Sequence, residues 1–236
     1  MKESSQDSTH LSDSNFMTTF FHEQKPPQDS VDHFRQIPWL NQHVSNASYK
    51  IIPTFSRHLK TSGEDYFFSR TINTPETIPH MISLRLKNMK TPDVTSDHPP
   101  SQSTNPSFTA HKTPTIVPEE PDVLCLLQLG TRGLDGHPAT IHGGVTCAIL
   151  DETMGLLCML HDHNIKEPGP RDSLYTANLN VSYRAPIPTP STVLVKTWLV
   201  KRQGRKLFSK GQIVDEKGTV LAEADGLWVV ARREKL

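Results

Sequence analysis

Apolar and polar side chains alternate over residues 79–86 and 173–186, and this period of two predicts β-strands. Residues 122–130 (DVLCLLQLG) are mostly apolar and are expected to form a buried strand. In residues 173–186, one face carries Tyr175, Ala177, Leu179, Val181 and Tyr183. Two hairpins follow, because residues 193–200 lead through a turn at Gly204 into 207–214, and a second turn at Gly218 leads into 220–231.

Residues 143–160 (GGVTCAILDETMGLLCML) are apolar on nearly every side, which is typical of a helix buried on most faces. A buried helix and a run of half-apolar strands are both covered when one sheet curls around the helix. The expected class is therefore α+β, with an antiparallel sheet wrapped around one long central helix. An open sheet also leaves edge strands, and pairing with a second copy would protect one of them.

Outside these stretches the chain is polar, and its 19 prolines indicate segments that are not packed into a core. Residues 1–30 are expected to form a disordered tail. Residues 31–69 are expected to form a short helical extension that packs outside the domain, with a helix over 31–46 interrupted at Pro38. Residues 70–236 form the predicted domain, with a disordered insertion at about 90–121.

Composition narrows the possible partners. The 25 basic and 25 acidic side chains cancel, which argues against nucleic acid or a membrane surface as a partner. No window has the roughly 20 apolar residues that span a bilayer, and the N-terminus has no signal-peptide core. Three cysteines without ligand spacing are expected to be reduced, and no metal is expected. A cytoplasmic location follows, with peroxisome or mitochondrion as weaker alternatives.

Candidate chemistry is concentrated in residues 136–155. Gly143 and Gly144 precede the helix, where free amides and the positive helix end suit an oxyanion. Asp151 lies on the same side of the helix about two turns later. Burying an unpaired charge in an apolar helix is costly, so a functional role is expected for Asp151. Glu152 is rotated by about 100° and is not expected to share that role.

These residues resemble the hotdog-fold thioesterase superfamily. The resemblance rests on His142-Gly143-Gly144, on Asp151 at the right spacing, and on a later Asn-x-x-Tyr strand at Asn180. It covers about residues 70–232 and includes the segments 73–79 and 134–138, typical of fungal members. The branch is that of the phenylacetate-pathway and mammalian long-chain acyl-CoA thioesterases.

The resemblance implies roles for matching positions. Asp151 would be the catalytic carboxylate, as general base or as nucleophile. His142 and Gly143 would contact the thioester carbonyl. Thr176 would reach the site from the partner subunit of a homodimer or homotetramer, and Asn180 and Tyr183 would be structural or line the cofactor pocket. Relatives also carry an amide side chain about six residues before the histidine, where this chain has Gly136 followed by His137.

Coenzyme A enters only as part of the substrate, and no other cofactor is expected. Its phosphates need cations, which the residues flanking the Gly204 turn could supply. A solvated hairpin tip explains the same residues equally well. They are Lys201, Arg202, Arg205 and Lys206. The other histidines, such as His161, fit no metal pattern and are interpreted as surface or structural residues.

The expected function is hydrolysis of an acyl-CoA or acyl-carrier-protein thioester to a free acid and a thiol. Serine-hydrolase chemistry is excluded, because the chain has no Gly-x-Ser-x-Gly motif. Two alternatives remain open. One is a non-catalytic module that binds acyl thioesters, and the other is release or editing of chains in a polyketide or secondary-metabolite pathway.

Overall fold

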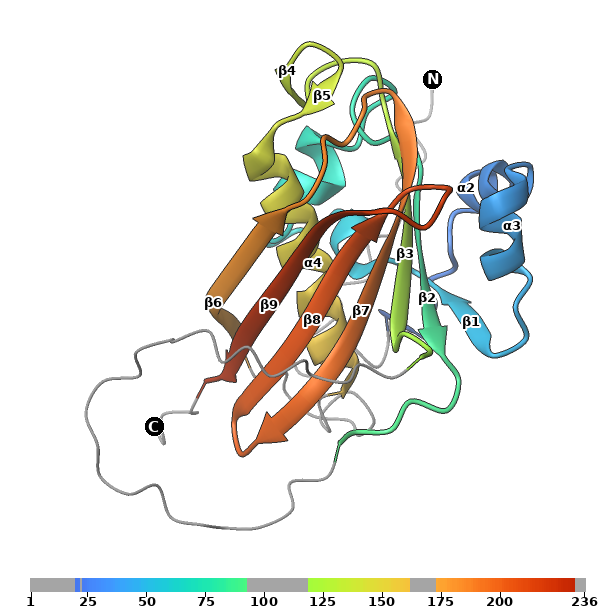
Figure 1. Cartoon of the computed structure of the whole chain (residues 1–236). Coiled ribbons are helices and arrows are strands. Elements are labelled where there is room, and N and C mark those ends of the chain that lie inside the picture. Colours follow the sequence, from blue (N-terminus) through green and yellow to red (C-terminus); the bar gives the residue numbers. More distant parts are fainter. Residues whose placement is uncertain (1–19, 22, 93–118, 162–172, 232–236) are drawn as a thin grey trace, which may run out of the picture.

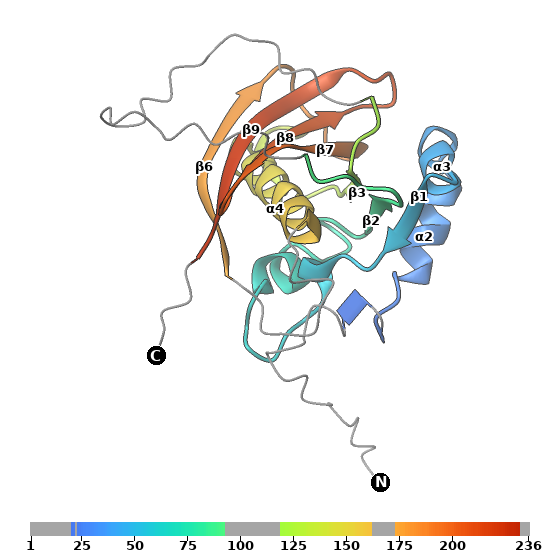
Figure 2. The ribbon, with the colours of Figure 1, turned by 90° about the horizontal axis from the view of Figure 1, so that it is seen from below.

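The computed structural model describes residues 20–21, 23–92, 119–161 and 173–231, and in these a seven-stranded antiparallel sheet curves around one helix (Figures 1 and 2). The strand order is β1-β2-β3-β7-β8-β9-β6. The strands of this sheet are β1 (Tyr49–Ile52), β2 (Met81–Leu86), β3 (Val123–Leu129), β6 (Leu174–Tyr183), β7 (Ser191–Gln203), β8 (Lys206–Val214) and β9 (Val220–Val230). This arrangement confirms the predicted α+β hotdog class.

The central helix α4 spans Gly143–His161 and lies in the concave face of the sheet (Figure 2). Its apolar side chains, such as Leu150, Met154 and Leu157, form one core with inward-facing strand residues. The helix is long and apolar enough to cross a membrane by composition, but the sheet that surrounds it identifies α4 as a core helix. Helix and sheet thus cover each other, as the alternation predicted.

The N-terminal extension contains α2 (Gln28–Arg35) and α3 (Pro38–Val44), two helices that restart at Pro38 as expected. Proline favours the first helical turn, where its missing N–H costs nothing. Both helices pack on the outer face of the sheet. Their shared apolar cluster includes Phe34 and Leu40 from the helices and Leu84, Leu126 and Leu194 from the strands.

The extension does more than the sequence predicted. Strand β1 pairs with β2 from Tyr49↔Leu86 to Ile52↔Ser83, so it is part of the main sheet. A domain boundary at residue 70 is therefore too late. The predicted tail 1–30 is also wrong in its last part, because Phe20 is buried and α2 begins at Gln28. Residues 1–19 and most of the predicted insertion, 93–118, lie outside the described residues.

Residues 53–72 continue from β1 along the side of α4 that the sheet leaves open (Figure 2). They contain the short helical turns η1 (Phe55–Arg57) and η2 (Phe67–Thr71). The guanidinium of Arg57 holds this segment together by donating to the carbonyls of Phe68, Ile72 and Ile78 at 2.7–3.3 Å. The extension thus covers both the outer face of the sheet and part of the central helix.

Strand β6 is one of the two edge strands of the sheet and carries a bulge. Its register with β9 shifts between Thr176, opposite Trp228, and Asn178, opposite Leu227, which leaves Ala177 as the extra residue. The single face predicted for the odd-numbered residues is therefore wrong. Thr176 faces α4 together with Leu179, Val181 and Tyr183, although it lies on the opposite side in a simple alternation.

A two-stranded sheet that the sequence did not predict precedes α4. Strands β4 (Asp135–His137) and β5 (Thr140–Ile141) pair with each other and lead the chain into the helix. The His142 amide donates to the Leu134 carbonyl at 2.7 Å, and the Ile141 amide donates to that of Ile187 at 3.0 Å. Backbone contacts therefore fix the direction from which the chain enters α4.

Candidate functional site

The His142 imidazole closes the N-terminal end of α4. Its Nδ1 accepts the amide proton of Gly144 at 2.9 Å. A nitrogen that accepts carries no proton, so in the neutral ring the proton lies on Nε2, which remains a donor. The Gly144 amide is thus used by the cap, contrary to the expectation that both glycines offer free donors. Among the described residues, the Gly143 amide has no protein acceptor.

Tyr183 fixes the same end of the helix from the last residue of β6. Its hydroxyl donates to the Gly143 carbonyl at 2.9 Å and lies 3.0 Å from the Cys147 sulfur. The hydrogen bond with Cys147, followed by partial burial, raises the pKa of Tyr183 to about 12, so the hydroxyl keeps its proton. A side chain at Gly143 would lie 3.2 Å from the Tyr183 oxygen, so only glycine fits comfortably there.

Asp151 and Thr176 meet on the inner side of β6. The Thr176 hydroxyl donates to Asp151 Oδ1 at 2.8 Å, and the carboxylate is partly exposed. Both residues belong to one chain, which corrects the expectation that Thr176 arrives from a partner. Because the β6 bulge turns Thr176 inward, the hydroxyl reaches this carboxylate without a second subunit. Asp151 is therefore a paired, accessible group rather than a fully buried charge.

The two halves of the site are far apart along α4. Eight residues separate Gly143 from Asp151, which corresponds to about 12 Å of helix. If the Gly143 amide binds the carbonyl oxygen of a thioester and Asp151 acts at its carbonyl carbon, the two groups must approach two atoms that are bonded to each other. Within one chain, the amide and the carboxylate cannot act on the same group.

Glu152, which the sequence analysis set aside, has a well-defined environment against the extension. Burial raises its pKa to about 7, the nearby Ser56 hydroxyl and Lys60 oppose the rise, and Asp65 and Asp151 add to it. Lys60 is itself buried, forms an ion pair with Asp65 and lies 3.6 Å from the centre of the Phe55 ring. These contacts tie residues 55–65 to the helical turn that carries Asp151.

Replacing Glu152 by Gln should stabilise the protein at alkaline pH and leave it nearly unchanged at pH 5. A carboxyl group whose folded-state pKa is raised favours folding below its ordinary value of 4.5. That contribution is lost as the pH rises from 4.5 to about 7. The amide does not titrate, so its advantage should grow to at most about 3 kcal/mol.

Urea unfolding at pH 5, 6, 7 and 8 measures this difference, with Glu216→Gln at an exposed turn as the matched control. A constant difference between Glu152→Gln and the unchanged protein across this pH range would show that Glu152 titrates normally.

The residues predicted to hold coenzyme A are not gathered at Asp151. Asn180 is opposite Asp225 and points to the outer face of the sheet. The Arg202 side chain donates to the His161 carbonyl at 3.2 Å, and that of Arg205 donates to the Val230 carbonyl at 2.8 Å. Lys201 and Lys206 are exposed. The cations therefore form a cluster at the hairpin between β7 and β8, near the C-terminal end of α4.

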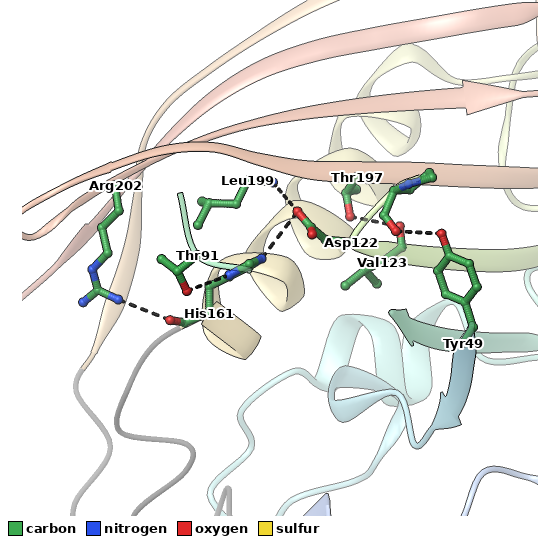
Figure 3. Close-up of polar contacts among 9 residues, drawn as sticks. Tyr49, Thr91, Asp122, Val123, His161, Thr197, Leu199 and Arg202 are labelled. Carbon is green, nitrogen blue, oxygen red and sulfur yellow. Dashed lines mark hydrogen bonds and ion pairs between the residues drawn. The ribbon is translucent and has the colours of Figure 1, made fainter. Parts of the chain in front are cut away.

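His161 is a buried structural residue, in keeping with its interpretation from the sequence (Figure 3). Its Nδ1 is hydrogen-bonded to Thr91 at 3.3 Å, and its Nε2 lies 3.4 Å from Asp122 Oδ2. Asp122 also accepts the Leu199 amide at 2.8 Å. This network fastens the end of α4 to β7 and to both described ends of the predicted insertion.

Comparison with known proteins finds similarity to one family and to several curated relatives. Residues 139–222 match the family model of the thioesterase superfamily. The acyl-coenzyme A thioesterase THEM4 of Rattus norvegicus is 38% identical over 112 residues, which are 47% of this chain and 44% of that protein. The verlamelin biosynthesis protein B of a Lecanicillium species is 28% identical over 225 residues, 86% of this chain and 89% of that protein.

Among solved structures, the BH2602 protein of Bacillus halodurans, determined with CoA, is 21% identical and aligns with a TM-score of 0.39 over 46% of this chain and 66% of that chain. The chain spans less than half the length of the rat thioesterase that it matches. The matched segment contains His142, Gly143, Asp151 and Thr176. Residues 139–222, which run from β5 into β9, are thus the part of the chain that is similar to the thioesterase superfamily.

Proposed function

We propose that this protein hydrolyses acyl thioesters, with Asp151 as the catalytic carboxylate. The observation that carries the proposal is the hydrogen bond from Thr176 to Asp151 at 2.8 Å, on a carboxylate that remains accessible in a mostly apolar helix. A structural carboxylate needs only to be neutralised. This one is oriented by a hydroxyl through one oxygen, which leaves the other oxygen for a water molecule or an acyl carbon.

In the proposed reaction, Asp151 acts either as general base or as nucleophile. As a base it takes a proton from water, whose oxygen bonds to the carbonyl carbon. The C–S bond then breaks, and the thiolate leaves and takes up a proton. The Gly143 amide and the Nε2 proton of His142 would stabilise the negative charge on the carbonyl oxygen. Thr176 positions the carboxylate and does not itself react.

We infer that the complete site is shared between two copies of the chain. The separation of Gly143 from Asp151 prevents one chain from supplying both groups to one thioester. A two-fold axis perpendicular to β6 at the edge of the sheet would make the two copies of α4 antiparallel and bring the Asp151 of each copy toward the Gly143 of the other. A homodimer is thus the smallest proposed functional unit, and a homotetramer would contain two such pairs.

The proposed substrate is an acyl-CoA, in line with the name of the rat relative. The cations of the β7–β8 hairpin would face the phosphates of the coenzyme.

A second candidate is chain release in a biosynthetic pathway, where the acyl group is carried by a phosphopantetheinyl protein. The observation that favours it is the match to the verlamelin biosynthesis protein, which extends over 225 residues and so includes the N-terminal extension.

Release of free thiol from a panel of acyl-CoA and acyl-carrier-protein thioesters tests both candidates. We expect turnover of at least one class by the unchanged protein and none by Asp151→Ala. Asp32→Ala, at an exposed position of α2, is the matched control and should keep full activity. Equal thiol release by the unchanged protein and by Asp151→Ala on every substrate would leave a binding module as the remaining interpretation.

A further inference from the structure

Two strand glycines, Gly211 and Gly226, make room for two large side chains between α4 and the sheet, next to the proposed site. A Cβ atom at Gly226 would overlap the indole ring of Trp228, and one at Gly211 would lie 2.7 Å from the Met154 sulfur. A Cβ at Gly155 would lie 3.6 Å from the indole nitrogen. The indole therefore extends along β9 over Gly226 and fills the layer between helix and sheet, where it is 2% exposed.

The position of Trp228 relates it directly to the catalytic pair. It lies opposite Thr176 in the register of β6 and β9, with both side chains facing α4. Gly155, which the indole approaches, is one helical turn beyond Asp151. The indole is thus placed directly inward from the Asp151–Thr176 pair, between that pair and the Met154 side of the core.

We infer that Trp228 forms the inner wall of the acyl-binding site and limits the length of the acyl chain. The inference rests on the proposed hydrolysis at Asp151. An acyl chain whose carbonyl lies at Asp151 gains affinity by burying its methylenes, about fourfold for each one. The apolar space directly inward of Asp151 is the layer between helix and sheet, and Trp228 occupies it. Chains that reach the indole would have to stop there or turn toward the subunit boundary.

The glycines support this role over that of an ordinary core residue. Glycine inside a strand is unfavourable, because it has no side chain to pack and loses more conformational freedom on folding. Gly211 and Gly226 are both in strand interiors, and both are adjacent to the Met154–Trp228 pair. The sheet thus accommodates the large Trp228 side chain on β9, the strand next to the one that carries the Thr176 hydroxyl.

The experiment compares kcat/KM for acyl-CoA substrates of two to sixteen carbons between the unchanged protein and Trp228→Leu, with Trp228→Phe as a milder variant. For each protein we take the kcat/KM of the longest substrate that is turned over efficiently and divide it by that of the shortest. This ratio should rise at least about tenfold in Trp228→Leu, because two or more further methylenes become buried. Trp198→Leu is the matched control. It is a buried tryptophan in β7, and the alternation with the core residues Val195 and Leu199 places it on the outer face of the sheet, so its replacement should leave the ratio unchanged.

The outcomes separate this inference from the proposed function. Hydrolysis with the same chain-length profile in the unchanged protein, Trp228→Phe and Trp228→Leu would overturn the role of Trp228 and leave the role of Asp151 intact. An absence of hydrolysis in the unchanged protein would overturn the proposed function itself. Thermal unfolding of each variant identifies any loss of folded protein, and the Phe variant keeps the comparison readable if the Leu variant unfolds.

Discussion

Replacing Asp151 by Asn should lower thioester turnover by about a thousandfold or more, because the amide can neither accept a proton nor attack the acyl carbon. The size of the side chain is unchanged, and the Thr176 hydroxyl can still donate to the amide oxygen. The fold should therefore be preserved. A far-ultraviolet circular dichroism spectrum and an unfolding curve equal to those of the unchanged protein would show that the chemistry alone is lost.

Replacing Gly143 by Pro should also remove most of the activity, by about a hundredfold or more, because it deletes the amide proposed to bind the carbonyl oxygen. Proline is well tolerated at the first position of a helix. The new ring would contact the Tyr183 hydroxyl. Gly143→Ala, which keeps the amide and makes a similar contact, is the matched control and should retain far more activity than the proline variant.

Mixing the two inactive variants decides whether the site is shared. In a mixed dimer, one site combines the intact Asp151 of one copy with the intact Gly143 of the other. Random exchange of equal amounts should thus restore about a quarter of the original activity per site, since one site in four is complete. If both groups acted within one chain, every site would stay defective. No recovery after refolding the mixture would therefore contradict the two-copy site.

Gly130→Ala should have the largest effect on stability among single-methyl additions. The new Cβ would overlap the carbonyl oxygen of Glu76 and lie 2.8 Å from that of Thr77. Both atoms belong to backbone that is already bonded to this turn: Gly130 donates to Thr77 at 2.6 Å, and Arg132 donates to Glu76 at 3.1 Å. The backbone cannot yield without losing these bonds, so we expect a loss of about 3 kcal/mol or more in the free energy of unfolding.

Gly155→Ala is the matched control, since its Cβ would make only an ordinary contact with Trp228 at 3.6 Å. Alanine favours a helix interior by about 1 kcal/mol over glycine, so this variant should be as stable as the unchanged protein or slightly more so. Urea unfolding of both variants measures the difference. A Gly130→Ala protein within about 0.5 kcal/mol of the unchanged one would show that the turn is more adaptable than its contacts indicate.

The alternation of apolar residues was sufficient to predict the core of the fold. Strands β2, β3, β7, β8 and β9 and the helix α4 lie where the pattern placed them, because each has one or all faces buried. Strand β1 was missed for a physical reason: four residues, Tyr-Lys-Ile-Ile, are too short to establish a period. The small β4–β5 sheet was missed because its residues are mostly exposed and are fixed by backbone bonds.

The candidate residues of the site could be predicted from the sequence, but the contacts between them could not. Spacing along the chain indicated Asp151 and two glycines as candidates, and the structure places these glycines as the first two residues of α4. Spacing could not show that His142 uses the Gly144 amide, because that depends on the rotamer of one imidazole. Nor could it reveal that the pKa of Glu152 is raised, since its partners Ser56, Lys60 and Asp65 come from a segment some ninety residues earlier. Contacts between distant segments leave no local signal.

The extra residue in β6 has a consequence for how this site tolerates change in length. Before Ala177 the even-numbered positions face the helix, and after it the odd-numbered positions do. Thr176 at one end of the strand and Tyr183 at the other therefore have opposite parity, and a regular strand could direct only one of them inward. Deleting Ala177 would leave the two residues six positions apart, an even spacing at which a regular strand directs both hydroxyls toward the helix without a bulge. The bulge therefore allows two inward hydroxyls at an odd spacing, and the strand can gain or lose a residue here only together with its bulge.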